Sequence, residues 1–306
     1  DIPKQARELY LKNPYRLIPS RVYKPVRLYP VINPIIGAFI DLSDCNLRSV
    51  PAVHLEYLKN MEVMASMSTR IIKDEKLWGL ISCHHRTEKY LDQEMCSLFE
   101  LMSNIISAKI SSIQDREELS FQNRLKDIQS RLMWQVYESN DLYEGLFNKE
   151  VNMLDLLNAG GAALVSPRQI RTIGNAPSRD QIREMVYWLQ NNPQREVYHV
   201  SNLQDVYEAA YEYSDVASGI IALPINAAKG EYIIGFRPEV VQEVNWGGNP
   251  NEAINFEKDS TNYHPLNSFR QWRQIVKNTS LPWLPQEVMI AQDFSTFVWN
   301  TEKRDR

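Results

Sequence analysis

Residues 77–85 read Leu-Trp-Gly-Leu-Ile-Ser-Cys-His-His. The stretch is short and apolar, which predicts a buried strand, and it ends in the imidazoles of His84 and His85. Residues 62–72 alternate between apolar and polar side chains like a second strand, and residues 73–76 (Lys-Asp-Glu-Lys) are typical of a turn. The sequence therefore predicts a hairpin that carries two histidines at its end.

A short helix is predicted just before this hairpin, over Pro51–Asn60, with Ser49 as N-cap and Pro51 in the first turn. His54 and Tyr57 are three residues apart, so they share one face of that helix. A lone histidine near an apolar strand is most often a satisfied core residue. Its role here depends on the rest of the chain.

Bulk properties limit the class of protein. With 306 residues, 43% of them hydrophobic, the chain suits about two domains with packed cores. A net charge of −4 without a basic stripe argues against nucleic acid as a partner, and the apolar runs are shorter than the ~20 residues of a membrane span. Three cysteines without metal spacing favour a reducing cytoplasm, and no metal site is expected.

The first half of the chain ends in an unusually long helical pattern. Residues 2–12 predict a helix with Asp1 as its cap, and residues 13–46 predict a long ordered loop. Residues 91–139 keep helical spacing without Gly or Pro, which predicts one helix of about 70 Å that bridges two domains. The alternative is two stacked helices with a break near residues 114–115.

A second domain follows, in which strands and helices alternate. Strands are predicted over residues 160–165, 218–225 and 232–237, and a helix over residues 179–190. This pattern predicts an α+β fold, a sheet with helices packed on it. The polar stretch that follows, to Pro285, is too long for an ordinary connection, and residues 286–299 return to helical spacing.

Together with the opening Asp1-Ile2-Pro3, the strand and helix described first resemble the chromophore pocket of the phytochromes. The resemblance implies the later part of a GAF domain over residues 1–112 and a PHY domain over residues 113–306. Each would be an antiparallel sheet with packed helices, and the long helix would join them. It also implies a longer parent protein, and a linear tetrapyrrole (bilin) that senses red and far-red light.

The resemblance assigns polar side chains to the two propionates of the bilin. Arg16 and Arg48 match the propionate-binding arginines, and a guanidinium suits a carboxylate because it pairs in a bidentate manner. Ser66 and Ser68 match the contacts to the second propionate, and two residues apart on a strand they face the same way.

Other matched residues surround the pyrrole rings. His54 matches the histidine beneath the pyrrole nitrogens, and His84 matches the donor to the carbonyl of the rotating D ring. The backbone carbonyl of Asp1 matches an acceptor for those nitrogens. The remaining matches that line the site are Ile2, Pro3, Tyr10 and Tyr57.

The attachment cysteine of the plant-type branch is missing, because Val53 stands directly before His54. The resemblance then favours the bacteriophytochrome branch, which attaches biliverdin through a cysteine near the N-terminus of the whole protein and outside this chain. Cys83 is expected to be an inert buried thiol, and Cys45 is the remaining alternative.

Residues 240–285 resemble the tongue of the PHY domain, a hairpin that covers the bilin and refolds when it isomerises. The sequence departs from the family pattern twice: Leu266 stands where an arginine partner of Asp1 belongs, and Gln274 replaces a glutamate. Glu62 is a further departure, at a position where the family prefers glycine. The matched tongue residues are Trp246, Pro265, Leu266, Ser268, Phe269 and Trp272.

The interpretation is a cytoplasmic, non-enzymatic photosensor with no catalytic residues of its own. It is expected to form a homodimer through the long helix and to signal to an output domain such as a histidine kinase. No phosphate-binding glycine loop, nucleophile elbow or kinase motif is present. The alternative is a GAF-type regulatory domain that binds another small molecule, such as a cyclic nucleotide.

Overall fold

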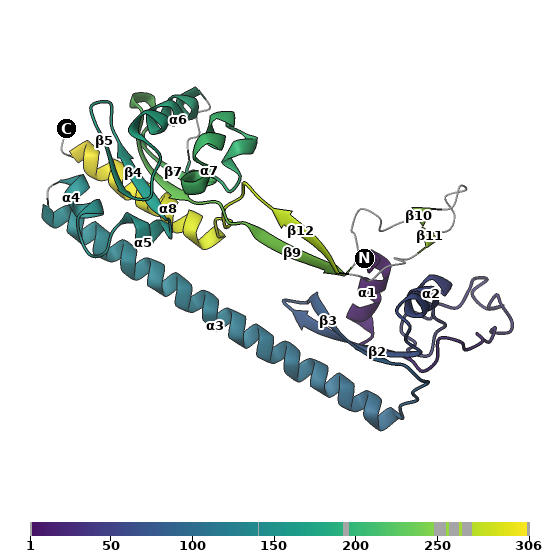
Figure 1. Cartoon of the computed structure of the whole chain (residues 1–306). Coiled ribbons are helices and arrows are strands. Elements are labelled where there is room, and N and C mark those ends of the chain that lie inside the picture. The colour runs from purple at the N-terminus through teal and green to yellow at the C-terminus, as the bar shows by residue number, and fades with distance from the viewer. Residues whose placement is uncertain are drawn as a thin grey trace. The chain divides into compact units, whose positions relative to one another are not determined.

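The computed structural model describes residues 2–139, 141–191, 196–247, 255–256, 263–264 and 271–304. These residues form two compact units (Figure 1). The first comprises Asp1–Glu117 with Asn245–Arg273, and the second comprises Glu118–Val244 with Gln274–Arg306. Both contain antiparallel sheets with packed helices, so the predicted α+β class is confirmed.

The first unit is built on a three-stranded antiparallel sheet in the order β1-β2-β3. Alternate residues of its strands face opposite ways. Tyr15 and Met67 pack with Cys96 of the following helix in a small core, so one face of the sheet is apolar. The elements are α1 (Lys4–Lys12), β1 (Tyr15–Ile18), α2 (Ala52–Asn60), β2 (Ala65–Lys73) and β3 (Lys76–His85).

The predicted hairpin is present, and Asp74 and Glu75 form its tight turn. Asp74 and Glu75 both have positive φ angles, of 49° and 59°, as the right-handed twist of a tight hairpin requires. Glu62 also has a positive φ, of 60°, in the turn between α2 and β2. Glycine adopts that conformation without steric cost, which gives a physical reason for the family preference at this position.

Several local predictions were wrong. The predicted loop over residues 13–46 contains the strand β1, which pairs with β2. Pro51, not Ser49, occupies the N-cap of α2, and Pro3 occupies the N-cap of α1. The predicted buried strand is exposed at its histidine end, because β3 is an edge strand of this sheet. Cys83 is accordingly an exposed thiol and not a buried one.

The helix α3 (Gln93–Ser139) is continuous over 47 residues, so the alternative of a break near residues 114–115 was wrong. Its first part anchors to the sheet of the first unit. The Ser107 hydroxyl accepts from the amide of Ile72 at 3.0 Å, and Lys73 lies 3.4 Å from Asp115. Its last part belongs to the second unit, where Gln135 donates to the carbonyl oxygen of Gly145.

The second unit is a sheet of five antiparallel strands, in the order β5-β4-β8-β7-β6, between two layers of helices. Neighbouring residues of β7 divide between the two cores: Ile221 packs with α3, α4, α5 and α8, whereas Ile220 packs with α6. The elements that complete it are α4 (Leu142–Phe147), α5 (Met153–Leu157), β4 (Gly161–Val165), β5 (Ile170–Gly174), α6 (Arg179–Asn191), β6 (Tyr198–Val200), α7 (Ser214–Ala217), β7 (Gly219–Asn226), β8 (Glu231–Arg237) and α8 (Pro285–Arg304).

The predicted tongue is described only in part. β9 (Gln242–Gly247) pairs with β12 (Gln271–Val276), and β10 (Asn255–Phe256) pairs antiparallel with β11 (Tyr263–His264). Within the first unit, the backbone of β11 lies beside α2. Among the described residues, no helix combines the length and apolar character of a membrane span.

Candidate functional site

One face of the first unit's sheet gathers polar side chains. Arg16 of β1 lies directly opposite Ser68 of β2, which lies opposite Ser82 of β3. Ser66 lies opposite His84. Residues directly opposite each other in an antiparallel sheet point to the same face, and residues two apart share that face. The register therefore places four predicted site residues together, and adds Ser82, which bonds to the Ser68 hydroxyl at 3.0 Å.

Arg16 is the charged centre of this face. It is only 9% exposed, and its guanidinium donates to the carbonyl oxygens of Asn46 at 2.7 Å and Arg48 at 2.5 Å. Burial and the positive charge of Arg48 lower the pKa of Arg16. Among the described residues, neither arginine has a carboxylate within salt-bridge distance. Two adjacent cations of this kind favour an anionic ligand.

Tyr10 of α1 belongs to the same group. Burial raises the pKa of its phenol, while a hydrogen bond with the Ser68 side chain and the charges of Arg16 and Arg48 oppose that rise. A phenol, a serine hydroxyl and two guanidinium groups thus converge from α1, β1, β2 and the loop before α2. This donor set fits the carboxylates of a ligand.

The helix α2 contributes His54 and Tyr57, whose rings lie edge to face with centroids 6.3 Å apart. Burial, assisted by the positive charge of Arg16 and by His84, lowers the pKa of His54 below its usual 6.5. The lowered pKa favours the neutral imidazole, which has one donor and one acceptor nitrogen. Burial also raises the pKa of Tyr57.

Several predicted residues are exposed, have only their backbones described, or lie outside the described residues. His84 is exposed, and the His85 ring is engaged with Thr87 next to it. Ile2 and Pro3 are exposed. Trp246 and Trp272 lie on β9 and β12, with only their backbones described. Outside the described residues are Asp1, Pro265, Leu266, Ser268 and Phe269.

Sequence reasoning missed Ser82, although its alternation with His84 along one strand was a visible signal. It also missed Arg70, which follows Ser68 on the same face of β2 and reaches α1. No local pattern indicates that contact, because it joins residues 60 positions apart.

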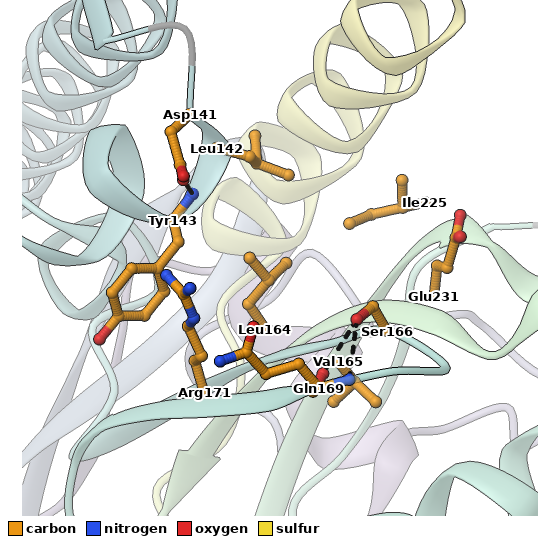
Figure 2. A pocket seen from close by; sticks show the side chains of 10 residues that line it. All are labelled: Asp141, Leu142, Tyr143, Leu164, Val165, Ser166, Gln169, Arg171, Ile225 and Glu231. Carbon is orange, nitrogen blue, oxygen red and sulfur yellow. Dashed lines mark hydrogen bonds between the residues drawn. The ribbon is translucent and has the colours of Figure 1, made fainter. Parts of the chain in front are cut away.

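A cavity of about 390 Å³ lies in the second unit, at α4 and the strands β4, β5 and β8 (Figure 2). Its Arg171 guanidinium stacks on the Tyr143 ring at 4.3 Å, and Gln169 and Ser166 bond to each other. None of the predicted site residues lines it. We place the candidate site on the sheet face instead, because the buried cation Arg16 and the half-buried cation Arg48 lie close together there.

Comparison with known proteins gives two family matches. The family model of the phytochrome region matches residues 125–306, and that of the GAF domain matches residues 30–110. The first match alone covers more than half of the chain.

Similar proteins include cyanobacterial phytochrome A of Nostoc sp., which is 38% identical over 98% of this chain and 39% of the relative. A bacteriophytochrome of Pseudomonas aeruginosa is 32% identical over 95% of this chain and 40% of the relative. The chain thus spans about two fifths of these proteins.

Solved structures agree with the sequence comparison. A bacteriophytochrome from the photosynthetic bacterium R. palustris has a TM-score of 0.76 at 36% identity, covering 99% of this chain and 61% of that one. The photosensory core module of the Stigmatella aurantiaca phytochrome has a TM-score of 0.69 at 33% identity, covering 99% and 60%.

Proposed function

Because this chain belongs to the phytochrome family, we propose that it is part of a red/far-red light receptor and binds a linear tetrapyrrole. The observation that carries this proposal is the pair of adjacent guanidinium groups, Arg16 and Arg48, beside Tyr10 and Ser68 on one sheet face. No observation favours the alternative of a cyclic-nucleotide site. The bilin supplies the absorption of red light and the isomerisation that follows.

The donor set of the site fits such a ligand. Arg16 and Arg48 would hold one or both propionates, with Ser66 and Ser68 as further hydroxyl donors. His54, neutral and on α2, would place its imidazole beneath the pyrrole nitrogens with Tyr57 beside it. His84 would donate to the D-ring carbonyl. Asp1, Ile2 and Pro3 complete the proposed site.

We propose biliverdin as the bilin, bound through a cysteine that lies outside this chain. Val53 removes the plant-type attachment position. Cys45 and Cys83 are free thiols within the first unit, but Cys83 lies on the opposite side of β3 from His84, since neighbouring strand residues alternate.

The signalling parts are proposed as well. The tongue, residues 240–285, is supported by the β9–β12 pairing and by β11 beside α2, the helix that carries His54. The proposed domains are residues 1–112 and 113–306, within a non-enzymatic cytoplasmic sensor that passes its signal to an output domain. A homodimer through α3 is supported by exposed apolar residues at helical spacing, namely Leu98, Leu101, Met102 and Ile105.

A titration of chromophore-free protein with biliverdin tests the proposal. We expect a saturable red absorption band at one bilin per chain, unaffected by a large excess of cyclic AMP or cyclic GMP. Absence of a saturable band, or displacement of the bilin by a cyclic nucleotide, would contradict it.

His84→Ala tests the proposed contact to the D ring. One hydrogen bond contributes on the order of 1 kcal/mol, which is too little to govern the binding of so large a ligand. Biliverdin uptake should therefore stay within a few-fold of the unmodified protein, while the yield of photoconversion falls. The neighbouring His85→Ala is the matched control and should leave both unchanged. Loss of bilin binding in a folded His84→Ala protein would show that His84 has a structural role and would contradict the proposed D-ring contact.

A further inference from the structure

The helix α1 has an unusual anchor at its C-terminal end. The Arg70 guanidinium donates to the carbonyl oxygens of Tyr10 at 3.0 Å and Leu11 at 2.5 Å. The last carbonyls of a helix lack partners within the helix, and a cation placed there also interacts favourably with the helix dipole. Arg70 therefore caps α1 from the neighbouring strand.

This cap matters because the helix is short and lies on the surface. α1 has nine residues, and none of them is buried. A helix this short is only marginally stable by itself, and its position depends on tertiary contacts. At its C-cap, Asn13 bonds to the carbonyl oxygens of Leu9 and Ser43, but it does not reach β2.

Arg70 also belongs to the polar row of the candidate site. It follows Ser66 and Ser68 on the same face of β2. Its backbone amide donates to Pro14 at 3.1 Å, and its backbone carbonyl accepts a hydrogen bond from the Ser103 hydroxyl of α3. One residue thus connects α1 to the central strand and to the long helix.

We propose that Arg70 is a positioning residue, which fixes the Tyr10 hydroxyl against Ser68 by holding the carbonyls of Tyr10 and Leu11. The inference rests on the proposed function, because it treats Tyr10 and Ser68 as part of the bilin site. Both hydrogen bonds come from one guanidinium nitrogen, Nη1, whose two N–H groups can donate to two neighbouring carbonyl oxygens. Arg70→Met keeps the aliphatic stem and removes the donors.

The first test needs no bilin. Hydrogen exchange of the α1 amides is measured in the chromophore-free chain for Arg70→Met, Arg70→Lys and the control Arg7→Met, an exposed arginine of the same helix. Loss of a charge-assisted cap should speed exchange in the last turn of α1 on the order of tenfold in Arg70→Met. The exchange rate in Arg70→Lys should lie between those of Arg70→Met and the unmodified chain. The rate in Arg7→Met should match that of the unmodified chain. Equal exchange in Arg70→Met and Arg7→Met would overturn the proposal.

The second test asks whether Arg70 acts through Tyr10. The rate of photoconversion under red light is compared in Arg70→Met, Tyr10→Phe and the double variant, each loaded with biliverdin. If Arg70 acts by placing the hydroxyl, the double variant should behave like Tyr10→Phe alone. If the two substitutions change the rate independently, so that their effects multiply in the double variant, Arg70 does not act through Tyr10. If the unmodified chain takes up no biliverdin, the proposed function fails, and the exchange experiment still decides whether Arg70 holds α1.

Discussion

Arg237→Met should destabilise the second unit by about 3–5 kcal/mol, the usual cost of removing one partner from a buried ion pair. The Arg237 side chain is 6% exposed and lies 2.8 Å from Glu287, which is 1% exposed. The guanidinium also donates to the carbonyl oxygens of Asn158 and Pro282 and stacks on the Trp283 ring at 3.6 Å. These contacts join the end of β8 to the start of α8. Methionine would leave the buried Glu287 carboxylate without its counter-ion, with only the Asn158 side chain and the Leu284 amide still donating to it.

The measurement is thermal unfolding, in which the midpoint of the second unit should fall by roughly 6–20 °C. Arg183→Met is the matched control, because its pair with Asp180 is short, at 2.6 Å, but exposed. Exposed pairs contribute about 0–1 kcal/mol, so its midpoint should barely move. Glu287→Gln keeps an acceptor oxygen for Arg237, so its unfolding midpoint should lie between those of Arg237→Met and Arg183→Met. Similar midpoints in Arg237→Met and Arg183→Met would show that the buried pair is dispensable.

Arg48→Ala combined with Arg16→Ala should weaken biliverdin binding by roughly 100-fold or more, since each charge-assisted hydrogen bond contributes about 1.5–3 kcal/mol. Arg16 also holds the carbonyls of Asn46 and Arg48. Its removal therefore loosens the loop as well as the ligand contact. Arg48→Ala alone should lower the affinity less, and it removes one loop contact of its own, to the carbonyl oxygen of Cys45. Exposed Arg86→Ala serves as the control.

A change in the ligand separates charge pairing from loss of structure. Biliverdin dimethyl ester carries no propionate charge, so the unmodified chain should bind it much more weakly than biliverdin in an absorbance titration. The double variant should bind both bilins with similar, weak affinity. Equal affinity of the unmodified chain for the two bilins would rule out the proposed propionate contacts.

Local patterns in the sequence predicted the elements whose stability is local. The hairpin before His84 follows from strand alternation and a turn, and α3 follows from helical spacing without Gly or Pro. The strand β1 was missed because its four residues stand between Pro14 and Pro19 and become a strand only by pairing with β2, some 50 residues later. The exposure of Cys83 depends on the edge position of β3, which no local pattern indicates.

In the candidate site, too, the sequence predicted local features and missed long-range contacts. Motifs predicted five residues of the site, namely Arg16, Arg48, Tyr10, His54 and Ser68. The strand register and the electrostatic interactions among their side chains show that they lie in one region of the first unit. The contacts between them could not be derived from spacing. Arg16 bonds to the backbone of the loop at Asn46, and Arg70 reaches back to α1 across 60 residues. Such long-range contacts depend on the folded chain as a whole.

The most direct test of the central claim is a red-minus-far-red difference spectrum of the biliverdin-loaded protein. Alternating red and far-red illumination should interconvert two absorbing states, with a loss of red absorption matched by a reversible gain at longer wavelength. The Arg16→Ala/Arg48→Ala variant, loaded under the same conditions, should give a much smaller signal. A protein that binds biliverdin and shows no light-dependent change would contradict the account of this chain as part of a photoreceptor.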